Sequence, residues 1–424
     1  MFIRKTLIPT AVLAGFLALF LRLFDFLAID PGFMEMITYH TIALGFIALS
    51  LRVPERREGP PDADFTAAKS GALIVSTYLV QAIVGLGVSI TLAYTFMPEF
   101  FKAAGLLLPM GYGQGPGQAN NVGSTYEVLG FAGGQSFGLS IAAAGFLVAC
   151  TIGVIDLNIQ FRRHRLHAET PEVLSGSVTV DAFQSENELP VSESVDRLSV
   201  QIALVLLVYM FTYLFSKYLT EFLAAAAPGI SATVSPLIWG FNFVIGALLA
   251  LICRKFFDLL TKSRIMTHQY PNNYLLSRIS GCAFDIMVIA GICAIDIKDL
   301  KGLWLPFLLM AVLGAVVTYF YLKWLCRKIY PSYYYEGFFS MFGMMTGTIS
   351  SGILLLREID PSFKTPAANN LLTGTSFAIL LGAPMLILIG MAPKSPSMLF
   401  LSCGLIVLYL LLLLLFIFKA QRRK

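Results

Sequence analysis

Long stretches without a charged residue constrain this 424-residue chain more than any other feature. A helix that crosses the hydrocarbon core of a bilayer needs about 20 predominantly apolar residues. Stretches that are charge-free or nearly so predict ten spans. The spans are 7–29, 34–51, 70–97, 135–161, 200–226, 230–253, 276–297, 302–325, 369–391 and 397–418. The fold class expected from them is an all-α polytopic membrane protein.

The composition agrees with a membrane protein. Hydrophobic residues make up 57% of the chain and charged residues 13%, against roughly 25% charged residues in soluble globular proteins. These proportions exclude an ordinary soluble enzyme, a disordered protein and a nucleic-acid-binding protein. The six cysteines form no CxxC pair, so neither a disulfide framework nor a zinc site is indicated. The first apolar run is longer than that of a signal peptide and is interpreted as an uncleaved span.

Two further charge-free stretches cannot be continuous spanning helices. The first, 103–126, contains GYGQGPG at 111–117, and the second, 337–356, contains GMMTGTISSG at 343–352. Each interior glycine costs a helix about 1 kcal/mol and proline about 3 kcal/mol. Non-helical backbone at membrane depth is tolerated only where protein or a watery cavity satisfies its hydrogen bonds. Both stretches are interpreted as re-entrant hairpins, which leave the membrane on the side they entered.

The distribution of basic residues supports this interpretation. With ten spans, hairpins at 100–130 and 334–360, and a cytoplasmic N-terminus, most Lys and Arg residues lie on the cytoplasmic side, as the positive-inside rule requires. Arg22 lies within the first span. Five of the 30 Lys and Arg residues fall outside: Lys102, Lys217, Lys298, Lys301 and Lys394. Counting either hairpin as a full crossing would split the basic clusters between the faces, so both termini are predicted to be cytoplasmic.

The order of parts in the first half of the chain returns in the second half. In each half three spans lead to a hairpin and a fourth span follows it. Five spans, counting 34–51 itself, separate the start of span 34–51 from the start of its counterpart 276–297. Five is odd, so the second half is inverted, which is typical of secondary transporters. The expected parts are a first repeat 1–161, a cytoplasmic linker 162–197, a connecting span 198–229, a second repeat 230–393 and a C-terminal span with a basic tail 394–424. In the linker, His164 and His167 have a spacing that allows a metal site, but a solvated basic loop is the plainer interpretation.

Five stretches carry a family resemblance when taken in order. They are IPTAVLAGFLAL at 8–19, YLVQAIVGLGVSI at 78–90, GYGQGPGQA at 111–119, AIDIKDL at 294–300 and MFGMMTGTISSGILLLREIDP at 341–361. This order resembles the bacterial sodium/glutamate symporter family and, more distantly, the citrate and 2-hydroxycarboxylate transporters. The resemblance implies a protein of the bacterial cytoplasmic membrane and a homodimer in which a transport bundle slides against a fixed scaffold. It also implies sodium as the coupling ion, no other cofactor, and a small carboxylate substrate, with glutamate the first guess.

The chain departs from the family pattern at several places. Gln114 and Pro116 stand where the first hairpin tip of the family has His and Thr, and Asp285 stands where the family has a small hydroxyl residue. The chain lacks one N-terminal span of the family and has an extra C-terminal one. These differences concern the substrate more than the fold.

The hairpin tips have the chemistry that such a cargo needs. Helix N-termini attract carboxylates, and exposed carbonyl and hydroxyl oxygens suit sodium. The candidate binding residues of the first tip are Gly113, Gln114, Gly115, Gly117, Gln118, Asn120 and Asn121. Those of the second tip are Thr346, Gly347, Thr348, Ser350 and Ser351. A single glycine would be explained by close helix packing, but two clusters at matching repeat positions favour a binding function.

A few polar residues within or beside the spans need separate explanations. Asp285 lies in mid-span, where an ionised side chain costs a few kcal/mol, and could ligate sodium, carry a proton or meet a substrate amine; Arg278 is two turns away, too far for a direct pair in most rotamers. Arg357 either binds a second substrate carboxylate or anchors the cytoplasmic end of the second hairpin. Asp156 is interpreted as an interfacial residue, and Gln81 as a helix-to-helix hydrogen-bonding residue.

The leading hypothesis is a sodium-coupled symporter of a small carboxylate that works by elevator-type alternating access. The alternative is a proton- or sodium-coupled transporter of another amino acid or of a di- or tricarboxylate, and a channel is more distant. Because the chain has no nucleotide-binding loop, HExxH motif or clear GxSxG elbow, we do not expect an enzyme.

Overall fold

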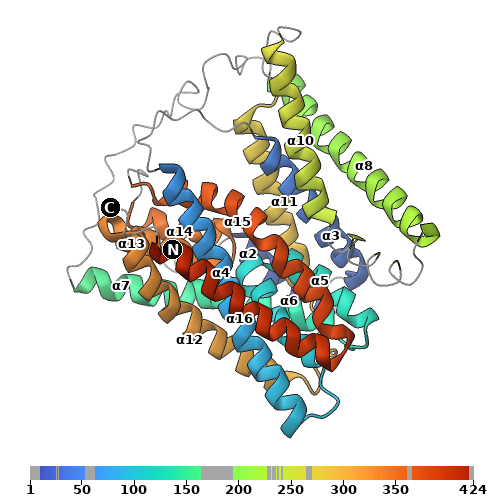
Figure 1. Cartoon of the computed structure of the whole chain (residues 1–424), viewed down its shortest axis with the longest axis vertical. Coiled ribbons are helices and arrows are strands. Elements are labelled where there is room, and N and C mark those ends of the chain that lie inside the picture. Colours follow the sequence, from blue (N-terminus) through green and yellow to red (C-terminus); the bar gives the residue numbers. More distant parts are fainter. Residues whose placement is uncertain are drawn as a thin grey trace. The chain divides into compact units, whose positions relative to one another are not determined.

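The computed structural model describes residues 10–24, 26, 28–52, 63–163, 194–226, 231, 235, 238–239, 242–263, 270–360 and 365–419 (Figure 1). The regular elements in these residues are all helical, which confirms the predicted all-α class. The α-helices are α2 (Thr10–Leu23), α3 (Pro31–Leu51), α4 (Ala63–Thr95), α5 (Pro116–Val128), α6 (Gly134–Val148), α7 (Val154–Arg162), α8 (Ser194–Ala226), α10 (Asn242–Lys262), α11 (Asn273–Ala294), α12 (Trp304–Ile329), α13 (Tyr334–Thr346), α14 (Ile349–Arg357), α15 (Ala367–Met391) and α16 (Pro396–Lys419). Short 3-10 turns are η1 (Lys102–Leu106), η6 (Pro331–Tyr333) and η7 (Ala392–Lys394), and π-helical turns are η2 (Pro109–Gly113) and η3 (Ala149–Gly153). Most of the linker, with His164 and His167, lies outside the described residues.

Eight of the ten predicted spans coincide with helical segments that are long and apolar enough to cross a membrane. These segments are 31–51, 65–95, 134–162, 198–226, 273–294, 304–329, 377–394 and 396–419. The chain is therefore a multi-pass membrane protein. On α16, the side chains of Leu411, Leu412 and Leu415 are more than half exposed, as expected of a helix that faces lipid.

Two predicted spans fall short of this length and apolarity among the described residues. The helix α2 has 14 residues, and at 1.5 Å per residue it is about 21 Å long, against a hydrocarbon core of about 30 Å. The helix α10 is described from Asn242 and extends past Arg254, and most residues between 227 and 241 lie outside the described part of the chain. Arg254 donates hydrogen bonds to the carbonyl oxygens of Ser50 (3.3 Å) and Arg52 (3.0 Å) at the end of α3, so a charged turn is held against the C-terminus of a neighbouring helix.

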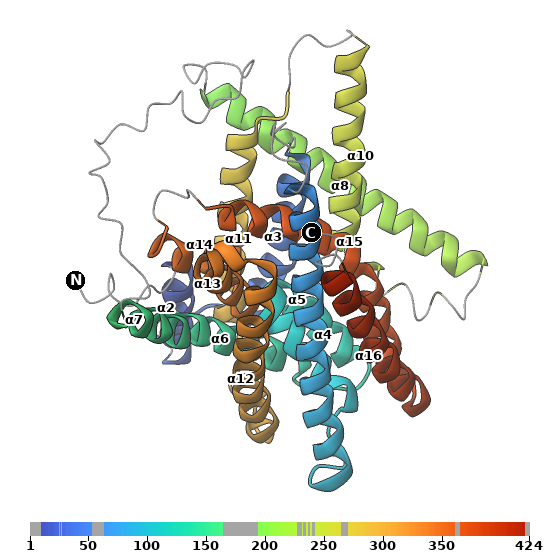
Figure 2. The ribbon, with the colours of Figure 1, turned by 60° about the vertical axis from the view of Figure 1, so that its left-hand side comes forward.

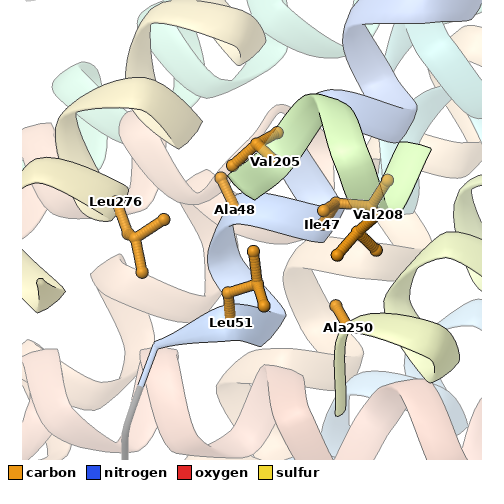
Figure 3. Close-up of a cluster of buried hydrophobic side chains, with 7 residues drawn as sticks. All are labelled: Ile47, Ala48, Leu51, Val205, Val208, Ala250 and Leu276. Carbon is orange, nitrogen blue, oxygen red and sulfur yellow. The ribbon is translucent and has the colours of Figure 1, made fainter. Parts of the chain in front are cut away.

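The chain divides into two compact units that do not follow its two halves. One unit comprises Met1–Glu35, Gly59–Thr170 and Val288–Lys424, and the other comprises Met36–Glu58 and Pro171–Met287. The core of the second unit is an apolar cluster from α3, α8, α10 and α11 (Figure 3). Its residues are Ile47, Ala48, Leu51, Val205, Val208, Ala250 and Leu276. Both glycine-rich stretches belong to the first unit.

The centre of the first unit is α4, which packs against α12, α15, α16 and η1. Figure 2 shows α4 running between α12 and α16. Small residues allow the closest of these contacts. Gly85 of α4 and Gly105 of η1 meet backbone to backbone, and a Cβ atom on either would collide with the other. This contact holds the segment that leads into the first glycine-rich stretch directly on α4.

We expect Gly85→Ala to destabilise the protein by about 1–3 kcal/mol, because an added methyl group would force two backbones apart. Gly87→Ala on the same helix is the matched control, since a Cβ atom there meets nothing within 4 Å. The measurement is the thermal unfolding midpoint of the detergent-solubilised protein. Equal midpoints for the two variants would show that the contact at Gly85 is not tight.

Candidate functional site

The first glycine-rich stretch contains a helix break at Gly115. The chain is helical through η2 and up to Gln114, and α5 begins at Pro116. Gly115 has φ +85° and ψ −174°, a conformation that is essentially restricted to glycine. Pro116 occupies the first helical position, where its missing N–H removes no helical hydrogen bond. The sequence prediction of an interruption in this stretch is confirmed, and we call Gly115 the first break.

The second glycine-rich stretch is interrupted at Gly347 and Thr348, between α13 and α14. We call these two residues the second break. The two helices pack closely beyond it: a Cβ atom on Gly343 would lie 2.7 Å from the carbonyl oxygen of Ser351 and 2.8 Å from Cα of Gly352. The chain therefore turns back on itself after Thr346, and glycine is what allows α13 and α14 to lie so near each other.

The two breaks lie against each other although they are far apart in the sequence. A Cβ atom on Gly115 would lie 3.4 Å from Cγ2 of Thr348 and 3.6 Å from the carbonyl oxygen of Gly347. The helix α6 lies alongside, with Gly145 against the carbonyl oxygen of Thr346 and the ring of Phe146 against Gly347. All of these residues belong to one compact unit.

Helix N-termini and a helix C-terminus meet at the breaks, so unsatisfied N–H groups and unsatisfied carbonyl groups both lie there. The helices α5 and α14 begin at the breaks, and neither cap residue, Gly115 or Thr348, makes a side-chain capping hydrogen bond. Their first N–H groups carry a partial positive charge and lack helical partners. The helix α13 ends at the second break, where its last carbonyl groups carry a partial negative charge. The N–H groups suit an anion, and the carbonyl groups suit a cation.

Three buried side chains near the helix starts have polar atoms without a partner in the described part of the chain. They are both amide atoms of Gln118, both amide atoms of Asn121 and Oγ of Ser351. Gln118 is 0% exposed, and Asn121 and Ser351 are each 3% exposed. Each unsatisfied buried group costs about 1–3 kcal/mol, so a bound molecule or water is needed to complete them. All three were candidate binding residues from the sequence.

Asn120 has a structural partner. Its Oδ1 accepts a hydrogen bond from Nε2 of Gln135 (2.8 Å), and Oε1 of Glu127 accepts one from the backbone N–H of Gln135 (3.0 Å). Burial raises the pKa of the Glu127 carboxyl, the Gln135 N–H lowers it and the nearby Asp299 raises it. These contacts fasten α5 to the start of α6, on the side of α5 opposite to Gln118 and Asn121, since positions 118 and 121 share one helical face.

The remaining candidate residues of the breaks are placed as follows. Gly113 lies under the ring of Tyr78 and beside Gln81 of α4. Thr346 Oγ1 donates to the carbonyl oxygen of Phe342 in its own helix (2.7 Å). Gln114 is partly buried and Gly117 is buried at the start of α5. The side chain of Ser350 lies outside the described part of the structure.

One charged candidate, Arg357, is not brought to the breaks. Arg357 is exposed at the far end of α14, about 12 Å along the helix from its first residue. Asp285 is exposed on α11 and belongs to the other compact unit. Among the described residues, the structure gives Asp285 no hydrogen bond or ion pair.

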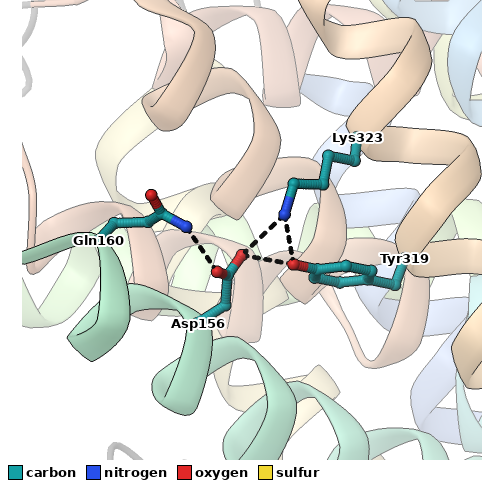
Figure 4. Close-up of polar contacts among 4 residues, drawn as sticks. All are labelled: Asp156, Gln160, Tyr319 and Lys323. Carbon is teal, nitrogen blue, oxygen red and sulfur yellow. Dashed lines mark hydrogen bonds and ion pairs between the residues drawn. The ribbon is translucent and has the colours of Figure 1, made fainter. Parts of the chain in front are cut away.

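Asp156 is buried near the end of the helical segment 134–162. Its Oδ1 accepts from Nε2 of Gln160 (2.7 Å) and its Oδ2 accepts from the hydroxyl of Tyr319 (2.9 Å; Figure 4). Lys323 Nζ lies 3.9 Å from Oδ2 and donates to the Tyr319 hydroxyl (2.6 Å). We call these four residues the Asp156 clamp. It joins α7 to α12, and the Tyr319 ring packs edge-on against Phe338 and Phe342 of α13, which leads to the second break.

Sequence reasoning did not place Gln81 at the breaks. Its Nε2 donates to Oγ1 of Thr318 on α12 (3.0 Å), which confirms the predicted helix-to-helix bond. The same nitrogen also donates to the carbonyl oxygen of Met345 (2.9 Å), next to the second break. A lone amide within an apolar span was the only signal, and it does not reveal which neighbours the amide meets.

Comparison of the chain with family models, with curated proteins and with solved structures finds no match in any of the three. Among the described residues, no group of three or more His, Cys, Asp or Glu side chains is placed to hold a metal ion.

Proposed function

We propose that the protein is a secondary active transporter that carries a small carboxylate together with sodium. The observation that carries this proposal is the meeting of the two breaks, Gly115 against Gly347 and Thr348. Free N–H groups at the starts of α5 and α14 suit the carboxylate, and the carbonyl end of α13 suits the cation. The unpartnered amides of Gln118 and Asn121 and the hydroxyl of Ser351 would orient the substrate.

The packing around the breaks supports the inverted repeat with two re-entrant hairpins. The helix α4 packs against η1 and its counterpart α12 packs against α13. Likewise α5 packs against α6, and α14 packs against α15. These two contacts in the first half of the chain thus each have an equivalent in the second half.

The division of the chain supports an elevator-type mechanism. Both breaks and the helices around them belong to one compact unit, whereas α3, α8, α10 and most of α11 form the core of the other. In the proposed cycle the first unit carries substrate and ion across the membrane as one body. The second unit would be the scaffold, and the homodimer implied by the sequence resemblance would form through it.

Glutamate is the first substrate to test, because the order of the sequence stretches resembles sodium/glutamate symporters. The experiment is uptake of labelled glutamate into proteoliposomes with and without an inward sodium gradient. Saturable, sodium-driven accumulation supports the proposal. Saturable uptake that ignores both sodium and proton gradients contradicts coupling, and conductance without saturable uptake indicates a channel.

If no glutamate uptake is observed, the next experiment is a screen of amino acids, dicarboxylates and tricarboxylates for uptake that is driven by a sodium gradient or by a proton gradient. A transported dicarboxylate or tricarboxylate would keep the carboxylate proposal and change only its substrate. Failure of every carboxylate under both gradients would refute the proposal.

A further inference from the structure

Gln81 is the one side chain in the described structure seen to hydrogen-bond both α12 and the backbone next to the second break. It is 1% exposed and lies in α4. Its Nε2 donates two hydrogen bonds, one to Oγ1 of Thr318 (3.0 Å) and one to the carbonyl oxygen of Met345 (2.9 Å). These two bonds fix the orientation of the amide, because turning it over would point its oxygen at the Met345 carbonyl.

The amide oxygen of Gln81 is buried and accepts no hydrogen bond from the described residues. It faces Gly113, the last residue of η2, since a Cβ atom on Gly113 would lie 3.0 Å from Oε1. The oxygen therefore points at the helix end that leads into the first break, while the nitrogen of the same amide holds the second. A buried amide oxygen in this position needs a hydrogen-bond donor or a cation as its partner.

The groups around Oε1 favour a cation over an anion. The helix α13 ends at Thr346 and η2 ends at Gly113, and the last carbonyl groups of a helix carry a partial negative charge. Amide and carbonyl oxygens carry no full charge. Such neutral oxygens suit a hard monovalent cation such as sodium, whereas a tightly held divalent cation uses carboxylates.

We infer that Oε1 of Gln81 is a ligand of the coupling cation, in a site of neutral oxygens between α4 and the two helix ends. The inference rests on the proposed function, because it assigns the ion of the same transport cycle to a residue outside the two hairpins. In this arrangement one amide holds the second break through its nitrogen and the ion through its oxygen. Binding of the ion would then couple the positions of the two breaks.

The experiment measures thermal unfolding of the purified full-length protein in detergent as sodium chloride replaces choline chloride at constant ionic strength. We expect sodium to raise the unfolding midpoint of the wild type. We expect Gln81→Met, which removes the oxygen and keeps the length of the side chain, to raise the half-maximal sodium concentration at least tenfold. Gln81→Asn, which withdraws the oxygen by one methylene group but stays polar, should do the same and serves if the first variant does not fold.

Two control variants separate an ion ligand from a structural bridge. Thr77→Val lies one turn earlier on the same face of α4, and its Oγ1 bonds only the carbonyl oxygen of Leu73 in that helix (2.8 Å); we expect its sodium dependence to stay within twofold of wild type. Thr318→Val removes the bridge partner but leaves Oε1 in place, so it should lower the midpoint without sodium and change the half-maximal concentration less than threefold. An equal tenfold rise in Thr318→Val would show that Gln81 acts as a bridge, and the inference would be wrong.

The outcomes also separate this inference from the proposed function. Sodium stabilisation that is unchanged in Gln81→Met overturns the inference and leaves sodium-driven uptake standing. Sodium stabilisation that Gln81→Met weakens, in a protein that transports no carboxylate, keeps the cation site and refutes the transport proposal. A wild type that sodium does not stabilise contradicts both.

Discussion

Gly115→Ala is expected to lower substrate uptake by ten- to a hundredfold while leaving a folded protein. The φ of +85° and ψ of −174° at Gly115 would cost an alanine about 1–3 kcal/mol of backbone strain, and each 1.4 kcal/mol corresponds to a factor of ten. The added methyl group would also lie 3.4 Å from Thr348 Cγ2, so relief of the strain must displace one break from the other. The measurement is kcat/KM for uptake into proteoliposomes, beside the unfolding midpoint in detergent.

Gly302→Ala is the matched control for the first break. Gly302 has φ +86°, and a Cβ atom there meets nothing within 4 Å. An alanine at this position also has to adopt a positive φ, but it lies in the turn before α12. We expect a similar loss of thermal stability and uptake within twofold of the wild type. If both variants lost uptake equally, the loss would come from general destabilisation and not from the geometry of the breaks.

The position of each break could be predicted because the signal is local. The sequence from Gly111 to Gly117 contains enough glycine and proline to end any helix, and the break falls at Gly115 within it. In the second glycine-rich stretch, the break falls at Gly347 and Thr348, between two helices. The structure places Gly115 against Gly347 and Thr348, a contact that neither local signal specifies.

The partners of single polar residues could not be predicted in the same way. Hydropathy identifies a span but does not say which neighbour a given side chain meets, so the sequence places Asp156 near a span end without revealing its partners. In the structure the π-helical turn η3 continues α6 into α7, and Asp156 is buried against α12. The same limit applies to Gln81, whose second acceptor, the Met345 carbonyl, comes from a distant part of the chain.

Helix length explains the difference that remains. Arg357 follows the second break closely in the sequence, but the intervening residues form the helix α14 and carry it away from the break. A linear pattern cannot resolve such a displacement, because it records apolar content and not the direction in which a helix carries its residues.

The Asp156 clamp supports the second large prediction: Asp156→Leu is expected to destabilise the protein by about 3 kcal/mol. The substitution removes the acceptor of Gln160 Nε2 and of the Tyr319 hydroxyl, and it removes the charge partner of Lys323. Removing one partner of a buried ion pair costs about 3–5 kcal/mol. The 3.9 Å separation and the 28% exposure of the Lys323 side chain place this pair at the lower end of that range.

A matched control and a double-mutant cycle would isolate the clamp from its helix. Asn158→Leu lies on the same helix, is exposed and bonds only the carbonyl oxygen of Val154 (2.8 Å), so its unfolding midpoint should stay close to that of the wild type. Lys323→Met alone would leave the carboxylate with its two neutral donors, Gln160 and Tyr319. In the double variant with Asp156→Leu, the loss of stability should be smaller than the sum of the single losses by about 1 kcal/mol. Strict additivity would mean that the charges of Asp156 and Lys323 do not interact. The contact of Asp156 with α12 would then depend on the hydrogen bond from the Tyr319 hydroxyl, which Tyr319→Phe removes.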